Sequence, residues 1–183
     1  MNERERLLGL LKSSALEIRN VTLSSGRTSS FYVDCKRVTL SPEGSYLTAR
    51  LMMDMIAPGV VAVGGLTLGA DPIVSSIVVL SRISGKGLSG LIVRKEPKRH
   101  GTRSFVEGPA LEQGAKVAVV EDVVTSGASL IRAIDRITEA GYQPVQALSI
   151  LDRREGGREA LMDRGFLLQS IFTREDLGLG NEK

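Results

Sequence analysis

Two adjacent carboxylates and a run of small, hydroxylated residues stand close together in residues 117–130, VAVVEDVVTSGASL. The acids, Glu121 and Asp122, follow four apolar residues. A buried strand of this kind in an open α/β sheet carries its last residues to the carboxyl edge of the sheet, where ligands bind. The small residues 125–129 then run into a predicted helix, and the N-terminus of a helix binds phosphate through its free N–H groups. The segment therefore predicts a site for a phosphorylated sugar.

The residue types divide this predicted site between a phosphate and a diol. Gly127 lets the backbone approach a phosphate closely, and the hydroxyls of Thr125, Ser126 and Ser129 add donors. The two carboxylates would repel a phosphate that they touched, so they suit the neutral hydroxyls of a ribose. Because side chains alternate along a strand, the two acids are expected on different sides of one small ligand. The alternative to this ribose 5-phosphate clamp is a structural strand–turn–helix in which the acids are accidental.

A second concentration of charge lies in residues 94–103, where five cations and the one histidine of the chain accompany a single acid. These residues are Arg94, Lys95, Lys98, Arg99, His100 and Arg103, with the acid Glu96. Such a run is a solvated loop, a nucleic-acid groove or a site for a small anion. No aromatic residue in this window could stack on bases, and only 4% of the chain is aromatic. A small anion is therefore favoured over nucleic acid.

The elements that must position these segments alternate between apolar strands and helices. Short apolar runs predict strands at 60–63, 91–93, 116–120 and 145–151. Periodic runs predict helices at 3–13, 42–55, 70–82 and 129–140, with a glycine-rich loop at 64–69. Two further extended runs, 16–23 and 30–36, flank a turn at 24–27. Fully apolar strands joined by helices indicate an α/β fold with a parallel sheet covered on both faces.

Length and composition predict one domain, residues 1–183, and exclude several classes of protein. The chain is 42% hydrophobic and 25% charged, with a net charge of +3. A single cysteine, Cys35, rules out an intramolecular disulfide and a cysteine zinc site. No apolar run is close to the length of a membrane-spanning helix, about 18 residues. The charged N-terminus does not resemble a secretory signal. We therefore expect a cytoplasmic protein. Residues 85–90 (GKGLSG) match a dinucleotide-binding motif but follow a helix and open a strand, the reverse of what that motif requires.

Residues 119–129, VVEDVVTSGAS, resemble the phosphoribosyl-diphosphate signature of the type I phosphoribosyltransferases. Three further segments resemble the orotate phosphoribosyltransferase family in particular. Residues 23–34 (LSSGRTSSFYVD) are similar to its segment that frames the base, and residues 94–101 (RKEPKRHG) to its mobile catalytic loop. Residues 151–153 (LDR) are similar to the motif whose arginine takes the orotate. The resemblance runs from about residue 5 to residue 173.

The resemblance implies a fold and a reaction. The fold is the type I phosphoribosyltransferase fold, a central, mainly parallel sheet flanked by helices, with a small hood from the N-terminal segment and the C-terminal part. The reaction transfers the 5-phosphoribosyl group from 5-phospho-α-D-ribose 1-diphosphate to orotate, forming orotidine 5′-phosphate and diphosphate in de novo pyrimidine biosynthesis. The alternatives are transfer to another nucleobase and a phosphoribosyl-diphosphate-sensing regulator on the same fold. The chain has no spare residues for a DNA-reading domain, which favours the enzyme.

The matched motifs imply roles for individual residues. Lys98 and His100 are implied as the catalytic residues that act on the leaving diphosphate. Phosphoribosyl-diphosphate binding is implied for Arg94, Lys95, Lys98, His100, Glu121, Asp122, Val123, Val124, Thr125, Ser126, Gly127, Ala128 and Ser129. Orotate binding is implied for Thr125, Arg153, Tyr32 and Val33.

A cofactor and an assembly are implied as well. Mg²⁺ is expected to arrive on diphosphate and ribose oxygens rather than in a protein metal site, and the acids Glu121 and Asp122 would touch it only through water. A homodimer is expected, with the basic loop serving the site of the neighbouring subunit.

Some of these residues could have structural roles instead. Arg153 could instead form a surface ion pair with Asp152 or Glu155. Core packing is the more ordinary role for Phe31 and for Tyr32, each taken singly.

Three positions depart from the family pattern. Ser24 stands where many members carry a lysine and cannot supply that charge. Asp71 lies where other members have a lysine near a glycine. It could organise its loop or a metal-bound water, but we favour a cap on the helix that starts at Pro72. Glu121 replaces an aspartate, a change of one methylene that still permits contact with a ribose.

Overall fold

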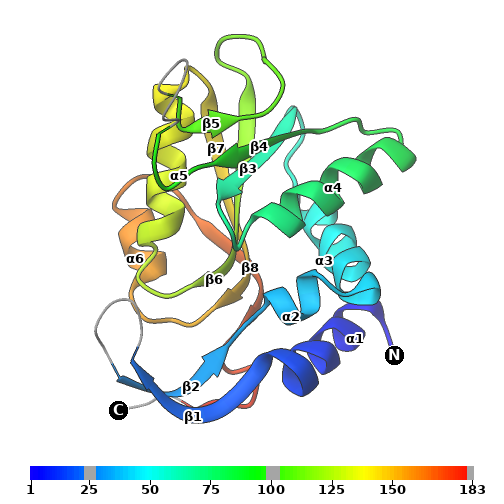
Figure 1. The fold of residues 1–183 in the computed structure, drawn as a ribbon, viewed down its shortest axis with the longest axis vertical. Helices are drawn as coiled ribbons and strands as arrows, with labels where there is room; N and C mark the ends of the chain where they lie inside the picture. Colours follow the sequence, from blue (N-terminus) through cyan, green and yellow to red (C-terminus); the bar gives the residue numbers. More distant parts are fainter. Residues whose placement is uncertain (23–27, 98–103, 181–183) are drawn as a thin grey trace.

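The computed structural model describes residues 1–22, 28–97 and 104–180, so Ser24, Lys98 and His100 lie outside the described residues. Its centre is a six-stranded sheet in the order β5–β4–β3–β6–β7–β8 (Figure 1). The strands are β3 (Ala62–Leu66), β4 (Ser89–Val93), β5 (Val106–Glu107), β6 (Lys116–Val124), β7 (Gln143–Asp152) and β8 (Leu168–Thr173). Neighbouring strands are parallel, except that β5 runs antiparallel to β4. The predicted α/β fold with a mainly parallel sheet is confirmed.

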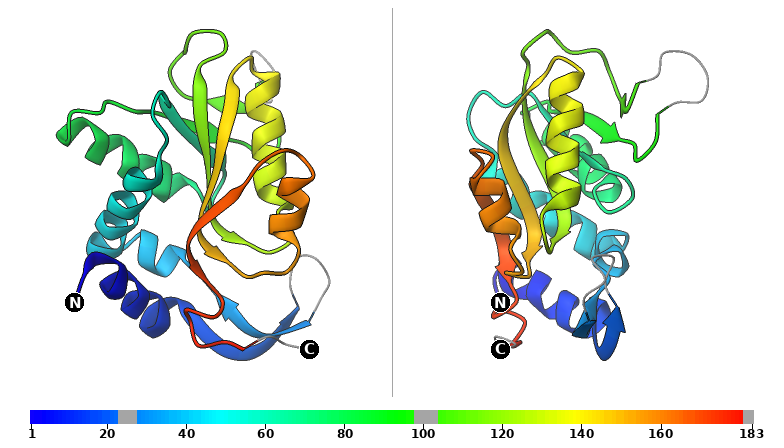
Figure 2. Two further views of the ribbon diagram at one scale, coloured as in Figure 1. Left: turned by 180° about the vertical axis from the view of Figure 1, so that it is seen from behind. Right: turned by 90° about the vertical axis from the view of Figure 1, so that its left-hand side faces the viewer.

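Helices cover both faces of this sheet. They are α1 (Glu3–Leu10), α2 (Lys36–Thr39), α3 (Pro42–Met55), α4 (Asp71–Ile83), α5 (Ala128–Glu139) and α6 (Gly157–Met162). Alternate residues of β6 enter two separate cores. Ala118 and Val120 pack with residues of α1, α3 and α4, whereas Val117 and Val119 pack with residues of α5. The left view of Figure 2 shows α5 to one side of β6 and β7 and α3 and α4 to the other. No helix in the described part of the chain is long and apolar enough to cross a membrane.

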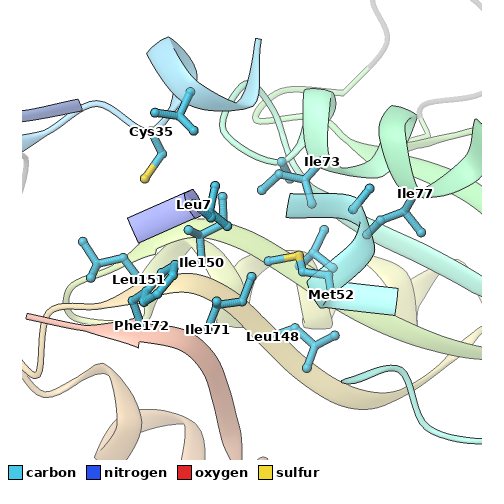
Figure 3. Close-up of a cluster of buried hydrophobic side chains, with 14 of the residues drawn as sticks. Leu7, Cys35, Met52, Ile73, Ile77, Leu148, Ile150, Leu151, Ile171 and Phe172 are labelled. Atoms are coloured by element: carbon cyan, nitrogen blue, oxygen red, sulfur yellow. The ribbon is translucent and has the colours of Figure 1, made fainter. Parts of the chain in front are cut away.

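The first of these cores anchors the sheet from one side. Figure 3 shows Met52 of α3 and Ile73 and Ile77 of α4 in the same cluster as Leu148 and Ile150 of β7. All five side chains are buried almost completely. Burial of a side chain of this size stabilises the fold by about 1.5–3 kcal/mol. The sheet edge that carries the predicted site therefore rests on a rigid support.

A separate two-stranded antiparallel sheet forms the predicted hood. Its strands are β1 (Leu16–Thr22) and β2 (Thr28–Val33), and β1 follows α1 through one turn of π-helix, Leu11–Ala15. Figure 1 shows this sheet beyond the carboxyl ends of β6 and β7. The chain after β8 joins it, since the guanidinium of Arg174 lies 5.4 Å from the ring centre of Phe31 in β2. The N-terminal and C-terminal parts thus meet over the same edge of the central sheet.

Several predicted boundaries differ from the structure. Strand β6 continues to Val124 instead of ending at 120, so both acids belong to the strand. Strand β3 includes Gly64 and Gly65, which the sequence placed in a loop. A Cβ atom on Gly65 would lie 2.3 Å from the carbonyl oxygen of Val120, so a glycine there lets two central strands approach closely.

Other elements were placed wrongly or missed. The extended run predicted at 30–36 ends at Val33, because Lys36 already begins the short helix α2. The sequence pattern did not predict β5, α6 or β8. Strand β5 has two residues and α6 has six, which is too short for a hydrophobic period to be recognised.

Candidate active site

The loop between β6 and α5 has the predicted geometry. Strand β6 ends at Val124, helix α5 begins at Ala128, and Gly127 between them adopts a left-handed φ of 79°. A small cavity of about 60 Å³ is lined by Glu121 and by residues 123–130. The first N–H groups of a helix have no partner within the helix, so they suit a bound phosphate. The structure therefore brings Glu121 and the small residues of the predicted clamp together around one cavity, which Asp122 does not line.

A glycine on a neighbouring helix supports this loop from behind. Gly157, the first residue of α6, is buried against it. A Cβ atom there would lie 2.4 Å from Cγ1 of Val124, 2.5 Å from the carbonyl oxygen of Thr125 and 3.0 Å from the nitrogen of Gly127. The conformation of the loop therefore depends on a residue 30 positions downstream of it in the sequence. Sequence reasoning missed Gly157, since neither its neighbours nor its spacing form a motif.

The two acids have different surroundings. Glu121 is 5% exposed, and its Oε2 has no hydrogen-bond partner among the described residues. Asp122 is half-buried, its Oδ1 accepts a hydrogen bond of 2.8 Å from the N–H of Val123, and its carboxylate lies against Gly69. Burial, together with the neighbouring carboxylate of Asp122, raises the pKa of Glu121 well above its ordinary value. Glu121 thus lines the cavity as a buried acceptor that a ligand hydroxyl could satisfy.

The raised pKa of Glu121 predicts a pH-dependent stability. Native protein binds the proton more tightly than the unfolded chain, so the free energy of unfolding falls as pH rises above 4.5, the ordinary glutamate value. Glu121→Gln keeps the shape but cannot ionise, so its unfolding free energy should fall less over the same range. Urea unfolding of both proteins between about pH 5 and pH 8 measures this difference. Glu159 on α6 is exposed, so Glu159→Gln is the control and should keep the wild-type dependence of unfolding free energy on pH. The same dependence in all three proteins would contradict the prediction.

Asp71, which follows the loop between β3 and α4, does not have the helix-capping role that the sequence favoured. The side chain of Asp71 does not cap α4, whose preceding residue Ala70 also forms no side-chain cap. Oδ2 of Asp71 instead accepts a hydrogen bond of 2.7 Å from the hydroxyl of Thr67. The favoured cap was therefore wrong, because Asp71 is already the first helical residue and its side chain turns back to the loop. Asp71 organises this loop, the alternative that the sequence left open.

The described part of the basic segment lies beside this loop. Arg94 donates to Glu107 through Nη1 at 3.3 Å and to the carbonyl oxygen of Glu96 through Nε at 3.2 Å. Lys95 is exposed, and its charge acts to lower the pKa of Glu121, against the larger effects of burial and of Asp122. A hollow of about 430 Å³ is lined by Thr67, Ile92, Arg94, Lys95, Glu96 and Glu107. Arg94 and Lys95 therefore line a hollow beside the loop between β3 and α4, whereas Lys98 and His100 fall outside the described residues.

The predicted base-binding residues lie where the hood meets the end of β7. Arg153 is 2% exposed, and its backbone N–H donates at 2.9 Å to the carbonyl oxygen of Val124, which ties the ends of β7 and β6 together. Its side chain pairs with Glu155 at 2.7 Å, so the alternative ion pair exists but is buried rather than at the surface. Phe31 is a core residue, as its ordinary reading suggested, and its ring faces Arg153. The contact of Phe31 with Arg153 was not predicted, because no recognisable motif signals it.

The other two base-binding candidates on the hood, Tyr32 and Val33, lie at the end of β2. Tyr32 is half-buried, with the guanidinium of Arg19 at 5.5 Å from its ring centre, and Val33 is buried. Thr125, at the start of the clamp loop, is half-buried. The structure thus places Tyr32 and Val33 in the hood, above the edge that carries Thr125 and Arg153.

A further cation near the acids was not predicted. Lys36 begins α2 and forms an ion pair of 2.7 Å with Asp34. Burial lowers the pKa of Lys36, but the hydrogen bond that its ammonium donates to Asp34 and the charge of Asp122 outweigh this and raise the pKa overall. Lys36 therefore stays positively charged beside Asp122. A lysine two residues after an aspartate at the end of a strand is too common a pattern to have predicted this.

Comparisons with known proteins identify the family. No protein-family model matches the chain. It is 51% identical over 174 residues to orotate phosphoribosyltransferase of Thermosynechococcus vestitus, covering 95% of this chain and 92% of the relative. The corresponding protein of Aquifex aeolicus is 41% identical, with coverage of 97% and 98%. The crystal structure of Mycobacterium tuberculosis orotate phosphoribosyltransferase with Fe(III) dicitrate superposes with a TM-score of 0.85 at 36% identity, covering 97% of this chain and all of that one. The chain belongs to the orotate phosphoribosyltransferase family.

Proposed function

We propose that this protein transfers the 5-phosphoribosyl group from 5-phospho-α-D-ribose 1-diphosphate to orotate, which yields orotidine 5′-phosphate and diphosphate in de novo pyrimidine biosynthesis. The observation that carries this proposal is the family membership over 95% of the chain. The geometry of the loop between β6 and α5 supports it, because that loop suits a ribose phosphate. Another crystal structure of the M. tuberculosis orotate phosphoribosyltransferase, with a TM-score of 0.80 and 35% identity, is of its complex with 5-phospho-α-D-ribosyl 1-diphosphate. The expected cytoplasmic location stays a prediction.

The clamp loop would hold the sugar phosphate. The N–H groups at the start of α5, with the hydroxyls of Thr125, Ser126 and Ser129, donate to the 5-phosphate. Glu121 and Asp122 accept hydrogen bonds from the ribose hydroxyls, and this contact would satisfy the buried Oε2 of Glu121. The anomeric carbon is thereby held in a fixed position between the hood and the basic segment.

The basic segment would stabilise the leaving group. Cleavage of the anomeric C–O bond leaves positive character on the sugar and adds negative charge to the diphosphate. Cations placed in advance around the diphosphate lower this barrier, because they cost no reorganisation during the reaction. Arg94 and Lys95 would bind the diphosphate in the ground state, and Lys98 and His100 would act mainly on the charge that develops in the transition state.

Arg153 would recognise the base. Orotate is a planar carboxylic acid, and a guanidinium pairs with a carboxylate through two parallel hydrogen bonds. Thr125 and the backbone of Tyr32 and Val33 would contact other edges of the ring. The base nitrogen would then lie on the side of the ribose opposite the departing diphosphate.

The family generally uses Mg²⁺ with phosphoribosyl diphosphate. Among the described residues no group of three or more His, Cys, Asp or Glu side chains could hold a metal ion. The chain does offer the unsatisfied Oε2 of Glu121 with Asp122 next to it, a donor set that fits an ion held mainly by substrate oxygens and reached through water. When bound, Mg²⁺ neutralises negative charge on the diphosphate.

A homodimer would bring a second copy to the groove between α3 and α4. Two hollows of about 370 and 500 Å³ share Ser45, Ser75 and Ser76 in this groove. Large apolar side chains are exposed around them: Leu40, Tyr46, Leu68, Val79 and Ile83. The larger hollow also reaches Asp71, so this apolar face is continuous with the candidate site. A second copy seated here could deliver its basic loop to the site.

One charged substitution tests whether this face forms the dimer interface. Val79→Glu places a carboxylate on a side chain that is 62% exposed, and its desolvation would oppose association. Gel filtration should then show the mass of one chain, 19.7 kDa, where the wild type shows twice that mass, and turnover should fall with it. Met162→Glu on α6, where the side chain is 60% exposed, is the matched control and should leave the dimer intact. A wild type that elutes as a monomer, or a Val79→Glu dimer, would overturn the proposed face.

The reaction itself is tested by a spectrophotometric assay. Orotate absorbance should decrease only when phosphoribosyl diphosphate and Mg²⁺ are both present, with release of diphosphate in equal amount. Turnover with a purine and none with orotate would overturn the base assignment. Binding of phosphoribosyl diphosphate without turnover of any base would instead favour a regulator on the same fold.

A further inference from the structure

Phe31 forms an aromatic platform under the arginine that faces the base site. Its ring is 1% exposed, and the guanidinium carbon of Arg153 lies 4.0 Å from the ring centre. The guanidinium of Arg174, from the segment after β8, lies 5.4 Å from the same centre. Arg153 and Arg174 are both buried, so these contacts are shielded from water. A cation over a desolvated ring interacts more strongly than one at the surface.

Glu155 holds the same arginine in a second direction. Its Oε1 accepts a hydrogen bond of 2.7 Å from Nε of Arg153, and the two side chains are 18% and 3% exposed. The ring of Phe31 limits the tilt of the guanidinium plane, whereas the bond to Nε limits its rotation within that plane. Together they fix the orientation of Arg153.

The fixed orientation matters for recognition of a carboxylate. An arginine side chain has many rotamers, and binding must otherwise overcome the entropy lost when one of them is selected. Bidentate pairing also requires the guanidinium and the carboxylate to be nearly coplanar. A guanidinium oriented before the ligand arrives reduces both costs.

We propose that Phe31 and Glu155 are positioning residues for the nucleobase, which set the plane of the Arg153 guanidinium for the carboxylate of orotate. The inference rests on the proposed function, in which Arg153 takes that carboxylate. It adds that selectivity for an acidic pyrimidine depends on the hood strand β2 and on the loop after β7, and not on Arg153 alone. Neither Phe31 nor Glu155 needs to touch the base.

The experiment compares orotate with uracil, which lacks the carboxylate. Phe31→Leu keeps most of the apolar volume but removes the ring, and Glu155→Gln keeps the shape but weakens the bond to Nε. Phe31→Leu should raise the KM for orotate by about tenfold, because Arg153 loses the desolvated ring that orients its guanidinium before the base arrives. Glu155→Gln should raise it severalfold, because the ion pair that limits rotation of the guanidinium becomes a weaker hydrogen bond to a neutral amide. In both variants the KM for phosphoribosyl diphosphate should stay unchanged, and the preference for binding orotate over uracil should shrink by the same factor as the orotate KM rises.

The chain offers a matched control for each variant. Phe172 is equally buried and carries the guanidinium of Arg4 at 4.7 Å, but Arg4 pairs with Asp176 instead of facing the base site. Phe172→Leu should therefore lower the unfolding temperature without changing the orotate preference. Glu175 pairs with the neighbouring arginine, Arg154, at 3.3 Å, and Glu175→Gln should leave both KM values unchanged.

The outcomes separate this inference from the proposed function. Arg153→Met tests the function: an unchanged orotate KM in that variant would show that the base site lies elsewhere. If Arg153→Met loses orotate binding while Phe31→Leu and Glu155→Gln keep the wild-type preference over uracil, the function stands and the inference fails. If Phe31→Leu does not fold, Glu155→Gln decides the question alone, because its side chain lies in a loop at the edge of the core. A loss of preference that Phe172→Leu or Glu175→Gln reproduces would also overturn it.

Discussion

Replacement of Lys98 by alanine is expected to lower kcat by about 10²–10³-fold, the usual consequence of losing one donor placed in advance for a developing negative charge. The family resemblance assigns Lys98 to the leaving diphosphate. Because that charge develops mainly in the transition state, the ground-state affinity for phosphoribosyl diphosphate should change much less than kcat. Steady-state kinetics with a separate measurement of substrate binding checks both parts of this prediction.

Lys116 provides the control for Lys98. It is exposed and begins β6, at the end of the strand opposite the acids. Lys116→Ala removes the same charge from the chain and should leave kcat unchanged, which excludes an effect of net charge. An unchanged kcat in Lys98→Ala would refute the role of this lysine. A loss that appears equally in substrate affinity would show that Lys98 serves binding rather than the transition state.

A methyl group on Gly157 is expected to lower kcat/KM for phosphoribosyl diphosphate by about 10²-fold, because misplacement of a binding group by about 1 Å has that effect. Its Cβ atom would lie 2.5 Å from the carbonyl oxygen of Thr125 and 3.0 Å from the nitrogen of Gly127, both backbone atoms that cannot rotate away. Gly157→Ala should therefore displace the phosphate loop, whereas orotate affinity should change less. Equilibrium binding of ribose 5-phosphate and of orotate distinguishes the two effects.

The control for Gly157 is a glycine with space around it. A Cβ atom on Gly9 in α1 has no neighbour within 4 Å, so Gly9→Ala should keep full activity. Gly157→Ala is also expected to lose about 1–3 kcal/mol of stability through overpacking. Both variants are therefore compared well below their unfolding temperatures. If Gly157→Ala binds ribose 5-phosphate as tightly as the wild type does, the loop does not depend on α6.

The clamp loop could be predicted because its structure is local. An apolar strand, two acids, a glycine and a helix lie within residues 117–139, and no distant contact is needed to bring them into order. The parallel sheet was predictable for a similar reason, since apolar strands joined by helices leave few other arrangements. The extension of β6 through Glu121 and Asp122 was not predictable. Acidic residues have a low propensity for strands, and only pairing with a neighbouring strand overcomes it.

The sequence by itself determined the fold class, the family resemblance and the position of the clamp, since these depend on residue type and spacing along a short stretch of chain. Only the tertiary structure showed that Arg153 rests on Phe31 and pairs with Glu155, that Gly157 supports the clamp, and that Asp71 turns to Thr67. It also decided the burial of Glu121, and with it the raised pKa. Most of these properties arise between segments far apart in the sequence. Packing and loss of water set their strength, and neither is defined until the chain has folded.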